Sequence, residues 1–249
     1  MPHFMMKTIT TLLLLFQLTS FGQAVQIDTL LIPKKEKLTD FQADKLKFPI
    51  VKTTSRKIDS LINFDLKNRL TNNEFEGLPI DATIIKWADD QLIFLNFEVT
   101  YNDNGILSLN ISAEGCGAYC TGWTEYYNYS TITGELLTLN EIVDAEKLKP
   151  KVIADKNNQY DEQRRELKKI LLDKNSGLDN EGYEWALEYY NSCELAFELE
   201  SFAIHKAYFE IIERCDLPNA IKSLTPVIEL KYDYNDIREY LKLPKLNPR

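Results

Sequence analysis

Residues 92–114 read LIFLNFEVTYNDNGILSLNISAE, and this stretch decides the fold class of the chain. Apolar and polar side chains alternate on both sides of the dipeptide Asn104-Gly105. Such alternation is typical of strands with one buried face, and an Asn-Gly pair favours the positive φ angles of a type I′ turn. The stretch therefore predicts an antiparallel hairpin with strands at residues 92–101 and 107–113.

Weaker patterns surround this hairpin. Strands are predicted at 48–51, 123–130, 195–213 and 227–232, and helices at 55–70, 140–173, 183–190 and 235–243. Ser55 is the expected N-cap of the first helix, and Pro150 is expected to interrupt or restart the second. We therefore expect an α+β fold in which an antiparallel β-sheet packs with helices. One compact domain is expected at 48–243, with a loosely held N-terminal arm at 25–47 and a C-terminal tail at 244–249.

The N-terminal segment predicts export. Lys7 is the only charged side chain before Asp28, and residues 9–21 are mostly apolar but too short to span a bilayer. Gly22 and Ala24 supply the small residues of a signal peptidase site. We expect a signal peptide at 1–24, cleaved between 22 and 24, no transmembrane anchor in the mature chain, and a secreted or periplasmic location.

The cysteine count is even, which in an oxidising compartment predicts two disulfides. The four cysteines are Cys116, Cys120, Cys193 and Cys215. We favour the pairs Cys116–Cys120 and Cys193–Cys215, and pairing across the two segments stays open as the alternative. Redox activity is a minor alternative, because active dithiols more usually have the Cys-x-x-Cys spacing.

Charge and composition exclude several classes of function. The 249 residues include 29 Lys and Arg against 38 Asp and Glu, a net charge of −9. Loss of residues 1–24 would leave 28 against 38, or −10. This balance argues against nucleic-acid binding and suits a cationic partner. His3 and His205 are the only histidines and no hydrolase or phosphate-loop motif occurs, so we assign no catalytic residues and expect no cofactor or metal.

Three central motifs and the closing segment carry a family resemblance. Residues 115–119 (GCGAY), 127–129 (YNY) and 133–142 (TGELLTLNEI) occur in order, followed by 228–232 (IELKY), Ile237 and Leu241. This pattern resembles the RsiV-like C-terminal domain family, domain of unknown function 3298. The resemblance implies an extracytoplasmic α+β binding domain without known chemistry of its own. In relatives the domain binds lysozyme as the outer part of an anti-sigma factor, or accompanies a peptidoglycan deacetylase domain.

The cysteine-flanked loop and the aromatic residues after it are the candidate binding site. Exposed tyrosine and tryptophan supply large amphipathic contacts to proteins or sugars. The candidate residues are Gly117, Ala118, Tyr119, Trp123 and Tyr127. For the strand aromatics the competing interpretation is packing within the sheet. Tyr119 lies in the loop itself, at the position where the family often has histidine.

These patterns favour a non-catalytic binding module of the cell envelope. Its expected partner is a protein, such as a cationic lysozyme-like one, or a peptidoglycan or other cell-wall glycan. The first alternative is a glycan hydrolase that uses two facing carboxylates, and the second is a structural envelope component. A calcium loop at 173–181 is a minor alternative to a plain acidic turn.

Overall fold

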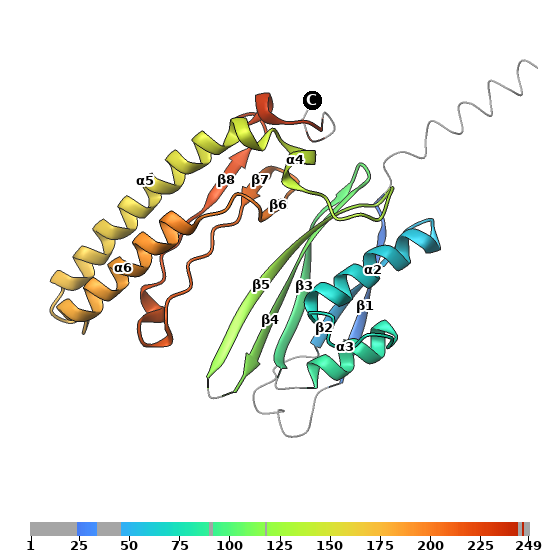
Figure 1. The fold of residues 1–249 in the computed structure, drawn as a ribbon, viewed down its shortest axis with the longest axis horizontal. Helices are drawn as coiled ribbons and strands as arrows, with labels where there is room; N and C mark the ends of the chain where they lie inside the picture. The colour runs from blue at the N-terminus through green and yellow to red at the C-terminus, as the bar shows by residue number, and fades with distance from the viewer. Residues whose placement is uncertain (1–23, 34–45, 90–91, 118, 244–245, 247–249) are drawn as a thin grey trace, which may run out of the picture. The chain divides into compact units, whose positions relative to one another are not determined.

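The computed structural model describes residues 24–33, 46–89, 92–117, 119–243 and 246. The chain divides into two compact units, Met1–Leu137 and Thr138–Arg249 (Figure 1). Each unit has a hydrophobic core of its own. The sequence, which has no obvious linker, predicts one compact domain at 48–243, whereas the packing divides that range after Leu137. The predicted signal peptide and tail lie outside the described residues, except for Ala24 and Leu246. Within the described ranges no helix is both long and apolar enough to cross a bilayer.

The first unit combines antiparallel sheets with helices (Figure 1). A two-stranded sheet has the order β1-β2, and a three-stranded sheet has the order β3-β4-β5. The elements are β1 (Gln26–Ile32), β2 (Leu46–Lys52), α2 (Arg56–Leu70), α3 (Ile80–Ala88), β3 (Leu92–Asp103), β4 (Ile106–Cys116) and β5 (Cys120–Ser130). The predicted α+β class, with antiparallel strands and helices, is therefore confirmed.

The predicted central hairpin is confirmed in its turn and in its antiparallel pairing. Asn104 and Gly105 have φ angles of 55° and 82°, as a type I′ turn requires. β3 and β4 pair antiparallel, with Val99 opposite Leu109. β4 continues into β5 with Leu109 opposite Tyr127. The three strands therefore form a meander that ends, on the side away from Gly105, at the Cys116–Cys120 connection.

One core joins both sheets and both helices of this unit. It gathers alternate side chains of β4 and apolar side chains of α2, α3, β1, β2, β3 and β5. Its most deeply buried members include Phe48, Ile62, Leu66, Ile84, Leu107, Ile111 and Tyr129. The helices thus hold the buried face of the meander and leave its far end, where the cysteines lie, at the edge of the unit.

A buried asparagine attaches α2 to β2. The Asn63 side-chain amide donates to the Val51 carbonyl oxygen at 2.8 Å, and the Asn63 carbonyl oxygen accepts from the Val51 N–H at 2.8 Å. Asn63 is buried, and Val51 is fully buried. The side chain therefore supplies the two hydrogen bonds that a neighbouring strand would otherwise give to this residue of β2.

The second unit is built around a helical hairpin and a small antiparallel sheet of order β6-β7-β8 (Figure 1). Its elements are α4 (Leu139–Ile142), α5 (Ala145–Leu172), α6 (Asn180–Ala196), β6 (Phe202–Ile204), β7 (Tyr208–Ile211), the 3-10 helix η2 (Asn219–Leu224), β8 (Leu230–Asp233) and the 3-10 turn η3 (Arg238–Tyr240). α5 and α6 lie side by side and pack through Tyr160, Leu167, Ala186 and Tyr190. A capping box joins Thr138 and Glu141 at the start of α4.

Several predictions about individual elements need correction. The expected loose arm at 25–47 is wrong for Gln26–Ile32, because these residues pair with β2 along their whole length. Pro150 lies inside α5 without ending it, since the packed hairpin outweighs the missing hydrogen bond. In the predicted strand region 195–213, residues 195–201 precede β6 and are not strand. In the predicted helix 235–243 only a 3-10 turn forms. The helix α3 was not predicted.

Candidate functional site

A disulfide closes the tip of the β4–β5 hairpin. Cys116 and Cys120 are opposite each other in the strand register and are bonded to each other. Inside the loop the Gly117 N–H donates to the Tyr119 carbonyl oxygen at 3.1 Å. The disulfide restrains the two ends of this loop, and such restraint lowers the entropy lost on binding a partner.

The tip presents two aromatic side chains. Tyr119 is 72% exposed, which is unusual for so large a ring, and Trp123 is 37% exposed on β5. Neither ring belongs to the hydrophobic core of the first unit. They are therefore available for contact with a ligand, whereas a ring that packs the sheet is not.

A shallow pocket of about 360 Å³ lies beside the disulfide. It is lined by Leu70, Asn72, Trp87, Leu92, Gly115, Cys116, Gly117 and Trp123. Asn72 begins the turn after α2 and has a φ of 49°, a left-handed conformation that asparagine adopts more readily than most residues. The pocket thus combines two tryptophans, an amide and the backbone of the tip, which is the mixture of apolar walls and few polar groups found in ligand sites.

The candidate residues from the sequence separate into three groups. Gly117, Tyr119 and Trp123 lie at the tip, and Ala118 lies outside the described residues. Tyr127 is 5% exposed and stacks with Tyr129 in the core, with ring centroids 6.5 Å apart. The structure thus places Tyr127 in the core and outside the candidate binding surface, since a buried ring cannot contact a partner.

Sequence reasoning missed the pocket's other wall. Trp87 lies on α3, and Leu70 and Asn72 lie at the end of α2 and just after it. These residues precede the cysteine loop by many positions, and only the packing of the helices against the sheet brings them there. The one sequence signal for this wall was Trp87, an isolated tryptophan in a segment for which no helix or strand was predicted.

The second disulfide joins Cys193 in α6 to Cys215, which follows β7. Both predicted pairings are therefore confirmed, and no cysteine is free. Cys215 is buried in the core of the second unit. This bond fixes the segment after β7 to the helical hairpin, which is a structural role.

The acidic segment at 173–181 forms a turn and a helix cap. An Asp173 carboxylate oxygen accepts from the Asn175 N–H at 2.9 Å, and Asp179 accepts from the Gly182 N–H at 2.8 Å as the N-cap of α6. These bonds give Asp173 and Asp179 backbone partners within the segment. Among the described residues, no group of three or more His, Cys, Asp or Glu is placed to hold a metal ion.

Glu213 is the candidate for a catalytic acid, because burial raises the pKa of its carboxyl group. The Tyr160 hydroxyl donates to the Glu213 carboxylate at 2.7 Å, and the charge of Lys156 opposes the shift. In the described part of the chain no second carboxylate contributes to this shift. A glycosidase needs two facing carboxyl groups, and the raised pKa of Glu213 does not by itself supply such a pair.

Substituting Glu213→Gln is expected to raise the free energy of unfolding near pH 7 and to change it little near pH 3, because the unfolded pKa of glutamate is about 4.3. The pKa of Glu213 is higher in the folded protein than in the unfolded chain. The contribution of this carboxyl group to the free energy of unfolding is therefore complete below the unfolded pKa and is lost as the pH rises through the folded pKa. Glutamine keeps an oxygen for the Tyr160 hydroxyl without the buried charge. Urea unfolding at both pH values checks this, and the exposed Glu188→Gln is the control. Equal stabilisation at both pH values would contradict it.

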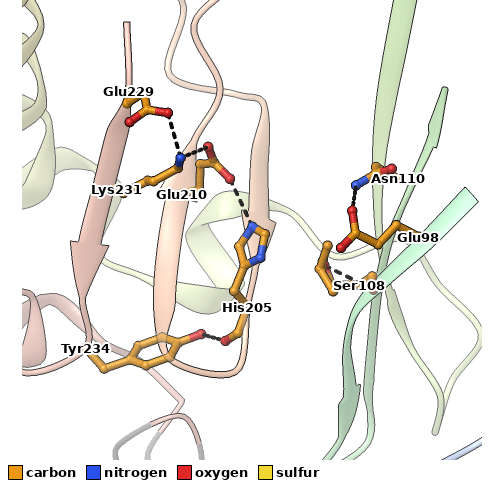
Figure 2. A network of polar contacts seen from close by, with 9 residues as sticks. Glu98, Ser108, Asn110, His205, Glu210, Glu229, Lys231 and Tyr234 are labelled. Atoms are coloured by element: carbon orange, nitrogen blue, oxygen red, sulfur yellow. Dashed lines mark hydrogen bonds and ion pairs between the residues drawn. The ribbon is translucent and has the colours of Figure 1, made fainter.

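His205 takes part in a polar network on the small sheet. It directly follows β6, and its Nε2 lies 2.9 Å from a Glu210 carboxylate oxygen (Figure 2). Lys231 lies 3.9 Å from Glu210 and 2.9 Å from Glu229, and the Tyr234 hydroxyl donates to the His205 carbonyl oxygen. The first unit has its own polar pairs on β3 and β4, such as Asn110 with Glu98 (Figure 2). These contacts engage the Nε2 atom and the backbone carbonyl oxygen of His205.

Fold and site define a two-unit α+β protein with one disulfide in each unit and an aromatic, disulfide-closed hairpin tip. Among solved structures, a DUF3298 family member from Bacteroides fragilis is similar over 91% of this chain and 98% of its own, with 17% identity and a TM-score of 0.59. A DUF3298 protein from Pseudomonas aeruginosa aligns over 92% and 96%, with 14% identity and a TM-score of 0.43. No protein-family model and no curated protein matches the sequence. The first structure confirms the predicted resemblance to DUF3298 proteins at the level of the fold.

Proposed function

We propose that this protein is a non-catalytic recognition module of the cell envelope, secreted or periplasmic, which binds its partner through the β4–β5 hairpin tip. The observation that carries the proposal is the exposure of Tyr119, inside the loop that the disulfide closes, and of Trp123, on the strand that leaves the loop. Aromatic side chains held on a rigid loop are the usual anchors of protein interfaces and glycan sites. The pocket beside Trp123 gives the partner a concave surface to enter.

The proposed location has two supports. The apolar segment at 9–21 followed by small residues fits a signal peptide. The two disulfides fit an oxidising compartment, because cytosolic thiols are kept reduced.

The proposed partner is a protein or a cell-envelope glycan, and charge favours a basic protein. At −9 the chain attracts cations over several ångströms, most strongly at low salt. A lysozyme-like protein, which combines a basic surface with a role at the cell wall, fits both requirements. A neutral glycan would use the same aromatic rings without the salt dependence.

Binding to hen lysozyme and to soluble peptidoglycan fragments tests the proposal. Trp123→Ala and Tyr119→Ala are each expected to weaken the partner's affinity by about 2 kcal/mol, roughly thirtyfold in Kd, because exposed aromatic anchors dominate such interfaces. Titration calorimetry at low and high salt separates the partners, since only lysozyme binding should weaken with salt.

Trp185→Ala is the matched control, because Trp185 on α6 is 39% exposed against 37% for Trp123. It should leave both affinities unchanged. Loss of affinity in the control equal to that in Trp123→Ala would overturn the role of the tip. Failure of both ligands to bind the unaltered protein would remove these two partner classes.

A further inference from the structure

A groove of about 590 Å³ lies in the second unit, between the first half of α5 and the end of α6. The segment Phe197 to Glu200, which leaves α6, forms part of its wall. All of its lining residues belong to this unit, so the groove is separate from the hairpin tip. Nothing in the proposed function uses it.

The base of the groove is organised by a buried lysine. Lys156 on α5 is 3% exposed, and its ammonium group donates to the Glu194 carbonyl oxygen near the end of α6. The same ammonium group lies 4.7 Å from the centre of the Phe197 ring. Burial lowers the pKa of Lys156. The lysine thus has partners in the fold, and it fixes the end of α6 and Phe197 in place as the floor of the groove.

The walls expose apolar side chains. Leu195 on the last turn of α6 is 88% exposed, and Ile153 on α5 is 36% exposed. Both line the groove together with the half-buried Phe197. An exposed leucine by itself is ordinary, but one that borders a groove with two further apolar side chains marks a contact surface.

The rim of the groove is acidic. Glu146, Glu198 and Glu200 line it, are exposed, and form no ion pair among the described residues. Lys149 is the exposed base that partly offsets them. The last carbonyl groups of α6 add the negative end of a helix dipole. Apolar walls with an acidic rim match a segment that carries an apolar side chain flanked by lysine or arginine.

We propose that this groove binds a cationic amphipathic segment of a partner protein. An apolar side chain of the segment packs against Leu195, Ile153 and Phe197, and its basic side chains reach the rim glutamates. This surface is a second binding site, independent of the hairpin tip. It adds a contact that favours proteins with basic, partly apolar segments over neutral glycans.

Fluorescence anisotropy with a labelled lysine–leucine peptide tests the groove in the purified protein. A peptide with glutamate in place of lysine is the charge control. Leu195→Asn should weaken binding of the basic peptide by about tenfold, because the packed apolar area is lost. Leu172→Asn is the matched control, since Leu172 is 71% exposed at the end of α5, outside the groove.

A second pair of variants separates the groove from general attraction to an acidic protein. Glu198→Lys with Glu200→Lys should abolish most of the binding, whereas Glu181→Lys with Glu184→Lys makes the same charge change outside the groove and should have a small effect. Trp123→Ala should leave peptide binding intact, which distinguishes this site from the tip. Equal losses in both charge pairs, equal losses in both leucine variants, or no peptide binding would overturn the proposal.

Discussion

An Asn63→Leu variant is expected to unfold with a free energy about 2–6 kcal/mol lower than the unaltered protein, because each buried polar group left unpaired costs about 1–3 kcal/mol. Leucine has the same branching as asparagine but is bulkier and offers no hydrogen bond, so the N–H and carbonyl groups of Val51 both lose their partner. Urea unfolding followed by tryptophan fluorescence measures the change. Trp87 and Trp123 report on the first unit, where both residues lie.

Asn68→Leu is the control on the same helix, because Asn68 is half-buried and forms no hydrogen bond of its side chain in the described contacts. It should change stability by less than about 1 kcal/mol, as substitutions away from special features usually do. If the two variants lost the same stability, the amide of Asn63 would not be what attaches α2 to β2.

Removing the Cys193–Cys215 bond by a double alanine substitution is expected to cost about 3 kcal/mol, the chain-entropy value for a loop of this size. The cysteines are 22 residues apart, so the bond removes much more freedom from the unfolded chain than the bond between Cys116 and Cys120, which are 4 apart. The same relation gives about 2 kcal/mol for the shorter loop.

A Trp87→Phe/Trp123→Phe background makes this measurement specific, because Trp185 then remains as the only tryptophan and reports on the second unit. Urea unfolding without reductant compares the two disulfide variants in that background. The Cys193–Cys215 variant should shift the Trp185 transition, and the Cys116–Cys120 variant should leave it unchanged. If the Trp185 transition shifted only in the Cys116–Cys120 variant, the assignment of each bond to its own unit would be contradicted.

The elements that the sequence predicts correctly are those whose signals are local. The turn at Asn104-Gly105 and the alternation around it depend on neighbouring residues alone, and so does the helical spacing of α2. The favoured disulfide pairs are also the observed ones, although the sequence left pairing across the two segments open. Ala118 and the signal peptide remain predictions, because they fall outside the described residues.

The elements that the sequence misses depend on distant partners. β1 ends in the consecutive apolar residues Leu30, Leu31 and Ile32, which hide its alternation, and its strand conformation comes from pairing with β2. Asn63 looks like an ordinary polar residue until β2 is placed beside it. Both Trp123 and Tyr127 were candidate binding residues, but Trp123 is exposed near the tip and Tyr127, four residues further along β5, is buried. Depth along a strand is set by the packed helices and not by the alternation.

The pairing of the disulfides has a consequence for how the chain acquires them. Each bond joins cysteines that are consecutive along the sequence, the first with the second and the third with the fourth. When such a chain enters an oxidising compartment N-terminus first, Cys116 therefore encounters Cys120 before the cysteines of the other pair arrive. Oxidation in order of arrival yields the native bonds, and we expect efficient oxidative maturation without an isomerase to reshuffle them.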